Sequence, residues 1–149
     1  MKKEEKKYTM TDDTIMIDGV KLSRIQALRD FGNVKAGELG GYISCEENLS
    51  HNGTCWVSDN AIVRDRAKVR DSAKVRDNAI ARDFALVRDR AIVMDDAIVR
   101  HSAIVSGEAT VHDRAIVRDF AIVRDRALVC EDALVGGFSR VGDVEIVKY

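Results

Sequence analysis

Three histidines and three cysteines are the side chains of this sequence that are best suited to acid–base or nucleophilic chemistry. His112 and Cys130 stand 18 residues apart, a spacing that recurs along the chain. A base beside a thiol suits nucleophilic catalysis, but nothing in the sequence orients this base or excludes water. A surface histidine on a flat strand is therefore the simpler interpretation of His112, and His101 is the other weak catalytic candidate. No two histidines are expected to share a site, and neither a metal nor a cofactor is predicted.

Arginines recur at the same spacing and form the second group that could do chemistry. If residues 18 apart lie above one another, guanidinium groups about 4.8 Å apart repel each other unless anions neutralise them. One explanation is a ladder of ion pairs with the aspartate that follows most of these arginines. The other is a site for a small anion or nucleotide, held by guanidinium forks at a subunit seam. The candidate ligand-binding residues are Arg64, Arg82, Arg100 and Arg118, and their candidate acidic partners are Asp65, Asp83 and Asp119.

Apolar side chains at the same spacing predict a contact surface. Aliphatic residues on one face and phenylalanines at its corner would expose a stripe larger than a soluble monomer usually leaves open. We therefore expect self-association as a homodimer or homotrimer; the alternative is that isoleucine is simply a good strand residue. The predicted interface residues are Ile62, Ile80, Ile98, Ile116, Leu134, Phe84, Phe120 and Phe138. The other faces carry mixed columns, such as Lys68, Leu86, Ile104, Ile122 and Arg140.

A repeat of six residues positions all these side chains. With valine as the reference, one phase holds from Val57 to Val147 and is interrupted only at Ala81. A small residue stands two positions before the reference, unbroken from Ala61 to Ala133, and aspartate usually stands two positions after it. The unit is Ala-x-Val-x-Asp-x. Its period excludes a coiled coil and an amphipathic helix, which need about 3.5 and 3.6 residues per turn.

Each unit predicts a short strand followed by a corner. Ala and Val alternate with outward residues, and the aspartate with its successor forms the turn, where the carboxylate can bond to nearby backbone. So short a strand cannot bury its apolar side alone, but stacked coils can, with every strand paired above and below. The sequence therefore predicts an all-β fold, a single-stranded parallel β-helix over residues 55–149. The absence of proline agrees with strands that need every N–H group.

This spacing resembles the hexapeptide-repeat superfamily of left-handed parallel β-helices, in which three hexads make one triangular coil. On that basis the repeat makes about five coils. The stretch DFGNVKAGELGGYISCEENLSHNGTCWVSDNA is similar to the start of YdcK-type hexapeptide proteins, which also occur in phage genomes. Many members of the superfamily are acyltransferases, so the resemblance implies a catalytic histidine at a subunit seam and a coenzyme A or acyl-carrier groove. The uninterrupted hexads argue against this activity, because no insertion leaves the coils to shape a cleft.

The segment before the repeat predicts a cap. Residues 14–17 and 20–28 flank Asp18-Gly19, a pair typical of a tight hairpin turn. We expect residues 11–54 to form this hairpin and to cap the first coil, since an uncapped edge invites pairing with another chain. The glycine-rich KAGELGG lacks a phosphate-loop pattern and predicts turn glycines at positive φ. Residues 1–10 are expected to be a disordered, charged tail.

Composition narrows the partners and the location. The 24 basic residues nearly balance the 25 acidic ones, and a net charge of -1 argues against nucleic acid and an anionic membrane as partners. The N-terminal MKKEEKKYTM predicts no signal peptide, and no segment is long and apolar enough for a membrane span. Cys45, Cys55 and Cys130 lack CxxC spacing, which predicts free thiols in a reducing compartment and no zinc site. We expect the cytoplasm, of a bacterium or of a phage-infected cell.

Three functional hypotheses follow from the sequence. The leading one is a non-catalytic, self-associating β-helix that binds a protein or a small anionic ligand. By analogy with phage proteins, its role could be to block or sequester a host-defence component. The second is a hexapeptide-type acyl- or nucleotidyl-group transferase with His112 or His101 as base. The third is a purely structural rod.

Overall fold

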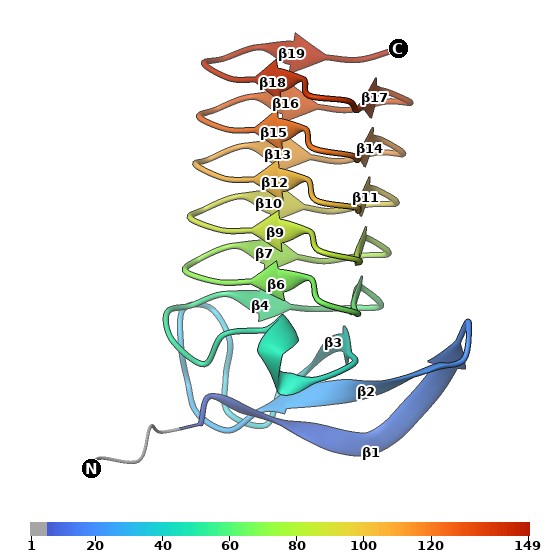
Figure 1. Cartoon of the computed structure of the whole chain (residues 1–149). Helices are drawn as coiled ribbons and strands as arrows, with labels where there is room; N and C mark the ends of the chain where they lie inside the picture. The colour runs from blue at the N-terminus through green and yellow to red at the C-terminus, as the bar shows by residue number, and fades with distance from the viewer. Residues whose placement is uncertain (1–5) are drawn as a thin grey trace.

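Very short β-strands, stacked in coils, make up most of this chain, and the computed structural model describes residues 6–149 (Figure 1). The N-terminal part contains β1 (Tyr8–Ile17), β2 (Val20–Ala27), β3 (Leu39–Ile43) and the 3₁₀-helix η1 (Glu46–Asn48). The stacked part contains β4 (Trp56–Val57), β5 (Ile62–Val63), β6 (Lys68–Val69), β7 (Lys74–Val75), β8 (Ile80–Ala81), β9 (Leu86–Val87), β10 (Ile92–Val93), β11 (Ile98–Val99), β12 (Ile104–Val105), β13 (Thr110–Val111), β14 (Ile116–Val117), β15 (Ile122–Val123), β16 (Leu128–Val129), β17 (Leu134–Val135), β18 (Arg140–Val141) and β19 (Ile146–Val147). No helix within the described residues is long and apolar enough to cross a membrane.

Three parallel sheets form the walls of the stack. Each strand from β4 onward pairs with the strand three places along, so that Ile80 lies opposite Ile98 and Ile98 opposite Ile116. We call the walls the first face (β5, β8, β11, β14, β17), the second face (β6, β9, β12, β15, β18) and the third face (β4, β7, β10, β13, β16, β19). The all-β prediction is confirmed, and the coils form a parallel β-solenoid of about six turns.

Alternation within each hexad builds the interior. The Val and Ala positions point inward and are fully covered, as at Ala97 and Val99, each 0% exposed. The residue between them points outward and is half-buried by its neighbours above and below, as at Ile98. Valine suits these strands because its branched side chain is stiff, and each small alanine lies next to a corner, where two adjacent walls meet.

The corner aspartates adopt a conformation that explains their recurrence. Most residues at this position lie in the left-handed region, for example Asp77 at φ 58° and Asp95 at φ 58°. Aspartate enters this region more readily than most side chains because it can bond to nearby backbone. Its carboxylate also accepts the backbone N–H of the residue 18 positions later, as in Asp95 N–H to Asp77 Oδ2 at 3.2 Å. Each carboxylate therefore joins two successive coils.

The N-terminal segment closes one end of the stack. The antiparallel hairpin of β1 and β2 turns at Asp18 and Gly19, which both have positive φ, as a two-residue hairpin turn requires. Strand β3 pairs with β2 on one side and with β5 on the other, so the hairpin continues the sheet of the first face (Figure 1). We call residues 6–54 the cap.

Two expectations about the cap are corrected. The predicted tail at 1–10 is wrong over residues 8–10, which belong to β1, because Tyr8 is fully buried and donates its hydroxyl to Leu49 O at 2.6 Å. Residues 1–5 lie outside the described part of the chain. Of the KAGELGG glycines, Gly37 has positive φ as predicted, but Gly40 lies in β3. Glycine is needed there because a Cβ would lie 2.5 Å from Val57 O.

Candidate functional site

The outward columns predicted from the 18-residue spacing are present as stacks. On the first face, Ile62, Ile80, Ile98 and Ile116 follow one another in register and end at Leu134, which is 49% exposed. At the other end Tyr42 of β3 pairs with Ile62, so the cap extends this column by one aromatic residue. The column is continuous, and it is half-buried from Ile62 to Ile116 and exposed at Leu134.

The phenylalanine column is the most exposed apolar feature of the coils. Phe84, Phe120 and Phe138 are 59%, 58% and 82% exposed, and the rings of Phe120 and Phe138 stack with centroids 5.2 Å apart. At the remaining levels of the column, the Arg66 guanidinium lies 5.6 Å from the centre of the Phe84 ring, and Ser102 is half-buried. We call these three phenylalanines the aromatic corner.

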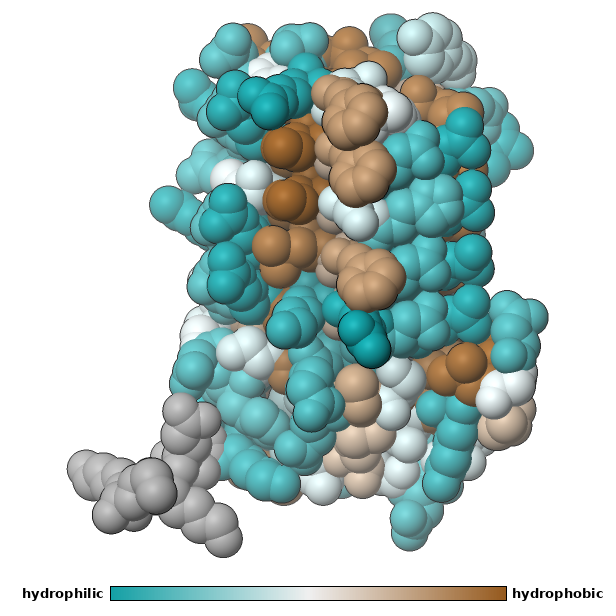
Figure 2. Space-filling model, viewed as in Figure 1, coloured by the Kyte–Doolittle hydropathy of each residue, from teal (hydrophilic) through white to brown (hydrophobic). Residues whose placement is uncertain are grey.

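The aromatic corner lies at the edge between two faces, so the second face borders it as well as the first. Arg82 separates Phe84 from the Ile80 column, whereas Leu86 on the second face lines a depression together with Phe84 and Lys68. Figure 2 shows the result as two apolar columns side by side on one side of the stack. One column is the aromatic corner. The other is the apolar middle of the second face, which consists of Leu86, Ile104 and Ile122 and lies between Lys68 and Arg140.

The arginine column divides into three different situations. Arg64 is enclosed under the hairpin tip, with Nη1 3.4 Å from Asp18 and Nε 3.5 Å from Asp65, so it anchors the cap rather than facing a ligand. Arg82 and Arg118 each lie beside the next carboxylate, at 3.7 and 3.6 Å, as the ion-pair explanation expected. Pairs this exposed contribute little individually.

Arg100 is the exception in this column, because His101 stands where its neighbours carry aspartate. In the described chain no carboxylate lies within ion-pair distance of Arg100, whereas its buried Nε lacks a hydrogen-bond partner just as the Nε atoms of Arg64, Arg82 and Arg118 do. Close by, Arg66, Arg82, Phe84, His101 and Ser102 line one open depression with Asp65 and Asp83. Arg100 itself does not line this depression, and Asp65 and Asp83 balance the charge of its two arginines. The groups that a small anion carrying a planar ring would use there are the guanidinium groups, the Phe84 ring and the Ser102 hydroxyl.

His101 is built into the backbone ladder. Its φ is 57°, as at the aspartate corners, and its Nδ1 lies 3.1 Å from the backbone N of Asp119. In the neutral ring Nδ1 accepts that N–H, which replaces the carboxylate used at the other levels. Asp119 in turn accepts the backbone N–H of Gly137, which lowers the pKa of Asp119, with a smaller contribution from His101. Nδ1 also lies 3.0 Å from Oδ1 of Asp119, so the contacts of this ring with the backbone and with the carboxylate both involve Nδ1.

His112 and Cys130 do meet, and a third side chain joins them. Strands β13 and β16 pair Val111 with Val129, so the residues that follow them lie one above the other. One ring nitrogen of His112, Sγ of Cys130 and a carboxylate oxygen of Asp113 all lie within 4.8 Å of one another. The sequence placed His112 beside Cys130 but missed Asp113. The signal was available, because Asp113 directly follows His112 at a corner and therefore lies next to the same pair.

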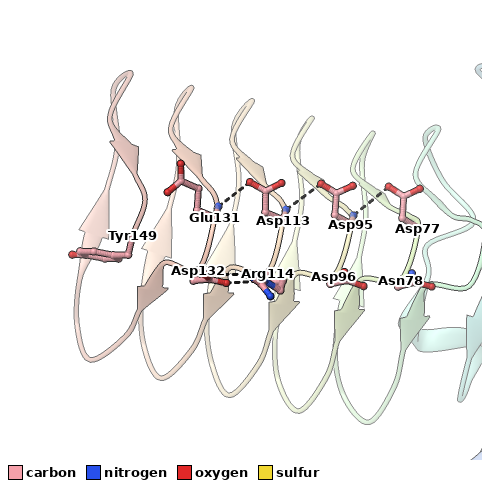
Figure 3. Close-up of a pocket in the computed structure, with 9 residues that line it drawn as sticks. All are labelled: Asp77, Asn78, Asp95, Asp96, Asp113, Arg114, Glu131, Asp132 and Tyr149. Atoms are coloured by element: carbon pink, nitrogen blue, oxygen red, sulfur yellow. Dashed lines mark hydrogen bonds and ion pairs between the residues drawn. The ribbon is translucent and has the colours of Figure 1, made fainter.

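Acidic residues gather along this same corner. Figure 3 shows Asp77, Asp95, Asp113 and Glu131 in one row, joined by their backbone hydrogen bonds. A second row beside it contains Asn78, Asp96, Arg114 and Asp132, and both rows line one open depression with Tyr149. We call the two rows the acidic corner. It would attract cations, whereas the aromatic corner lies beside arginines.

The fold defines the class of this protein as a parallel β-solenoid, compatible with the hexapeptide-repeat β-helices that its sequence resembles. No protein-family model matches the chain, and no curated protein sequence is significantly similar to it. The three cysteines are free, as predicted.

Proposed function

We propose that this protein is a non-catalytic β-solenoid that associates with itself and acts by binding, with the aromatic corner as the contact between copies. The observation that carries the proposal is the exposure of Phe84, Phe120 and Phe138 in one column at a corner of the stack. Stacked aromatic rings beside an aliphatic column are the kind of surface that a second copy of the chain would cover.

The neighbourhood of the corner indicates which faces meet. If the aromatic corner and the second face form the interface, Ile104→Lys should split the oligomer, since a lysine at the centre of an apolar contact loses its solvation. Ile98→Lys tests the first face in the same way. Thr110→Lys is the matched control, because Thr110 occupies the same strand position on the third face and is also half-buried.

The measurement is the mass in solution, by sedimentation or light scattering, across a range of concentrations. We expect a dimer or trimer for the original chain and for Thr110→Lys, and a monomer for Ile104→Lys. Dissociation by Ile98→Lys alone would assign the contact to the first face instead. A monomer at all concentrations for the original chain would overturn the proposal of self-association.

A small anionic ligand is a second candidate, favoured by Arg100 and the depression beside it. Thermal shift with nucleotides, cyclic dinucleotides, phosphate and coenzyme A would test it. Binding that is lost in Arg100→Ala and Arg82→Ala, but kept in Arg126→Ala, would support a site at this column. Arg126 is exposed and lies on a different corner, which makes it the matched control. If none of these compounds shifts the melting temperature, the remaining candidate is a protein partner, such as a host-defence component of a phage-infected cell.

The transferase alternative needs a histidine free to act as base, and His112 is the better placed of the two. Coenzyme A binding, together with transfer activity that His112→Ala abolishes, would favour the enzyme over the binding protein. If neither ligand binding nor self-association is observed, the structural rod becomes the favoured hypothesis.

A further inference from the structure

The backbone fixes His112, Asp113 and Cys130 in place before any ligand arrives. His112 follows β13, and its N–H donates to Val129 O at 2.9 Å, one residue before Cys130. Asp113 lies in the left-handed region at φ 58° and accepts the backbone N–H of Glu131 at 2.8 Å. The side chains are therefore held on two adjacent coils of a hydrogen-bonded wall, which favours a preorganised site.

Each of the three side chains keeps a metal-ligating atom that makes no hydrogen bond to the backbone, and these atoms lie within 4.8 Å of one another. Oδ2 of Asp113 takes the Glu131 N–H, which leaves Oδ1 beside the imidazole, 3.1 Å from Nδ1 of His112. Cys130 is only 7% exposed, and within residues 6–149 its sulfur has no hydrogen-bond partner. Cys55 shows the contrast, because its sulfur contacts the carbonyl oxygens of Ser50 and Val69. A buried, unpartnered sulfur beside imidazole and carboxylate points to a ligand that takes all three.

We propose that Cys130, His112 and Asp113 bind a divalent transition-metal ion of the zinc type. A thiolate, an imidazole and a carboxylate are accepted together by such ions, whereas calcium and magnesium prefer oxygen alone. Tetrahedral ligands at about 2.0–2.3 Å from zinc lie about 3.3–3.8 Å apart, so small side-chain rotations would bring the present cluster to this geometry. The His112 side chain is 22% exposed, which leaves the fourth position open to water.

The surrounding charge favours a cation. Asp95 lies 3.5 Å from Nδ1 of His112, and the acidic corner continues on both sides of the site. Binding exchanges the thiol proton for the metal ion and releases that proton to solvent.

The same surroundings argue against a cysteine nucleophile. Burial, and then the neighbouring Glu131 and Asp113 carboxylates, raise the pKa of the Cys130 thiol above its usual value. A catalytic thiol needs the opposite environment, with a cation nearby to favour the thiolate. A metal ion supplies that positive charge itself when it binds.

Cobalt is the sharpest probe, because a cobalt–thiolate bond gives a charge-transfer absorption in the near ultraviolet that carboxylates alone do not. After chelator treatment and dialysis, titration with Co²⁺ should produce this band and saturate at one ion per chain, and Zn²⁺ should displace it. Cys130→Ser should abolish the band. His112→Gln and Asp113→Asn should weaken Zn²⁺ binding by about tenfold or more.

Two control variants separate the site from general attraction. Cys45→Ser removes another thiol that is not buried, and Asp96→Asn removes a charge of the acidic corner that belongs to no donor set; both should keep the band. Circular dichroism without metal shows whether each variant folds. Absence of the band, or Zn²⁺ binding that is unchanged in Cys130→Ser, would overturn the proposal, and the second result would indicate binding that does not involve the thiol.

Discussion

The cap and the coils are stabilised in opposite ways. In the coils the same small residues recur at nearly every level, and Val63, Val99 and Val123 are equally buried. The cap depends on large residues that occur once. Its centre contains Trp56 from the first coil, packed edge-on against Phe31 at 5.2 Å and against Tyr8 at 6.4 Å.

This difference determines where the molecule can vary. Since the interior of the coils is uniform, each layer contributes a similar share of stability and the outward residues are free to differ between corners. The aromatic corner and the acidic corner are examples, because they carry different outward residues on the same uniform interior. In the cap, by contrast, individual residues are fixed by specific contacts. The buried Lys7 donates to Cys55 O at 2.7 Å, and burial lowers the pKa of its amine.

Trp56→Ala should have the largest effect, because it removes a large buried side chain of the first coil that packs against two aromatic rings of the cap. A buried tryptophan replaced by alanine costs about 3–5 kcal/mol. Ile92→Ala is the matched variant in the coils, in the same column two coils further on, and should cost about 1 kcal/mol since Ile92 is only half-buried. Urea denaturation followed by far-ultraviolet circular dichroism measures both, and equal losses would contradict the comparison.

Ala97→Leu should come next, because the interior of the coils has no room for a larger side chain. Ala97 is fully buried between coils, and overpacking such a position costs about 1–3 kcal/mol. Arg126→Leu introduces the same side chain at an exposed corner and should change the free energy of unfolding by less than about 0.5 kcal/mol. If both variants unfold at the same urea concentration, the interior is looser than the structure implies.

The sequence predicted the strands and the inward residues because each six-residue repeat forms one strand and one corner of a coil. It also placed His112 beside Cys130, since parallel pairing turns a spacing of 18 residues into contact. It could not place the Phe84 ring between two faces, because the period does not specify which way a corner side chain leans. The contacts of Lys7 and His51 in the cap could not be predicted either, as no repeat relates residues 44 positions apart.

The corner aspartates allow a finer comparison of three substitutions at one site. Asp77→Ala loses both the hydrogen bond from Asp95 N–H and the tolerance for positive φ, which should cost about 1–2 kcal/mol in total. Asp77→Gly loses only the bond and should cost less, as Gly107 and Gly137 already occupy this position at φ 63° and 61°. Asp77→Asn keeps both features and should be nearly neutral. Urea denaturation of all three variants tests this order, and an alanine variant as stable as the asparagine variant would contradict it.

Mild acid should distinguish the cap from the coils through His51, with the smallest effect. His51 stacks on Tyr8 at 4.2 Å, and its Nδ1 accepts the backbone N–H of Lys7 at 3.0 Å, which requires the neutral ring. Burial lowers the pKa of His51 below its ordinary value of 6.5, although Glu46 partly opposes this.

The unfolded chain therefore binds a proton at His51 more readily than the folded chain does, and the free energy of unfolding falls as the pH drops from 6.5 toward the folded pKa. Backbone hydrogen bonds lower the pKa values of Asp113 and Asp119, so these residues change the free energy of unfolding only near and below their ordinary pKa of 3.8. The pH range in which they act is therefore separate from that of His51. Urea denaturation between about pH 5 and pH 8 should show a loss below about 1 kcal/mol that shrinks in His51→Gln. An unchanged slope in that variant would assign the acid sensitivity to groups other than His51.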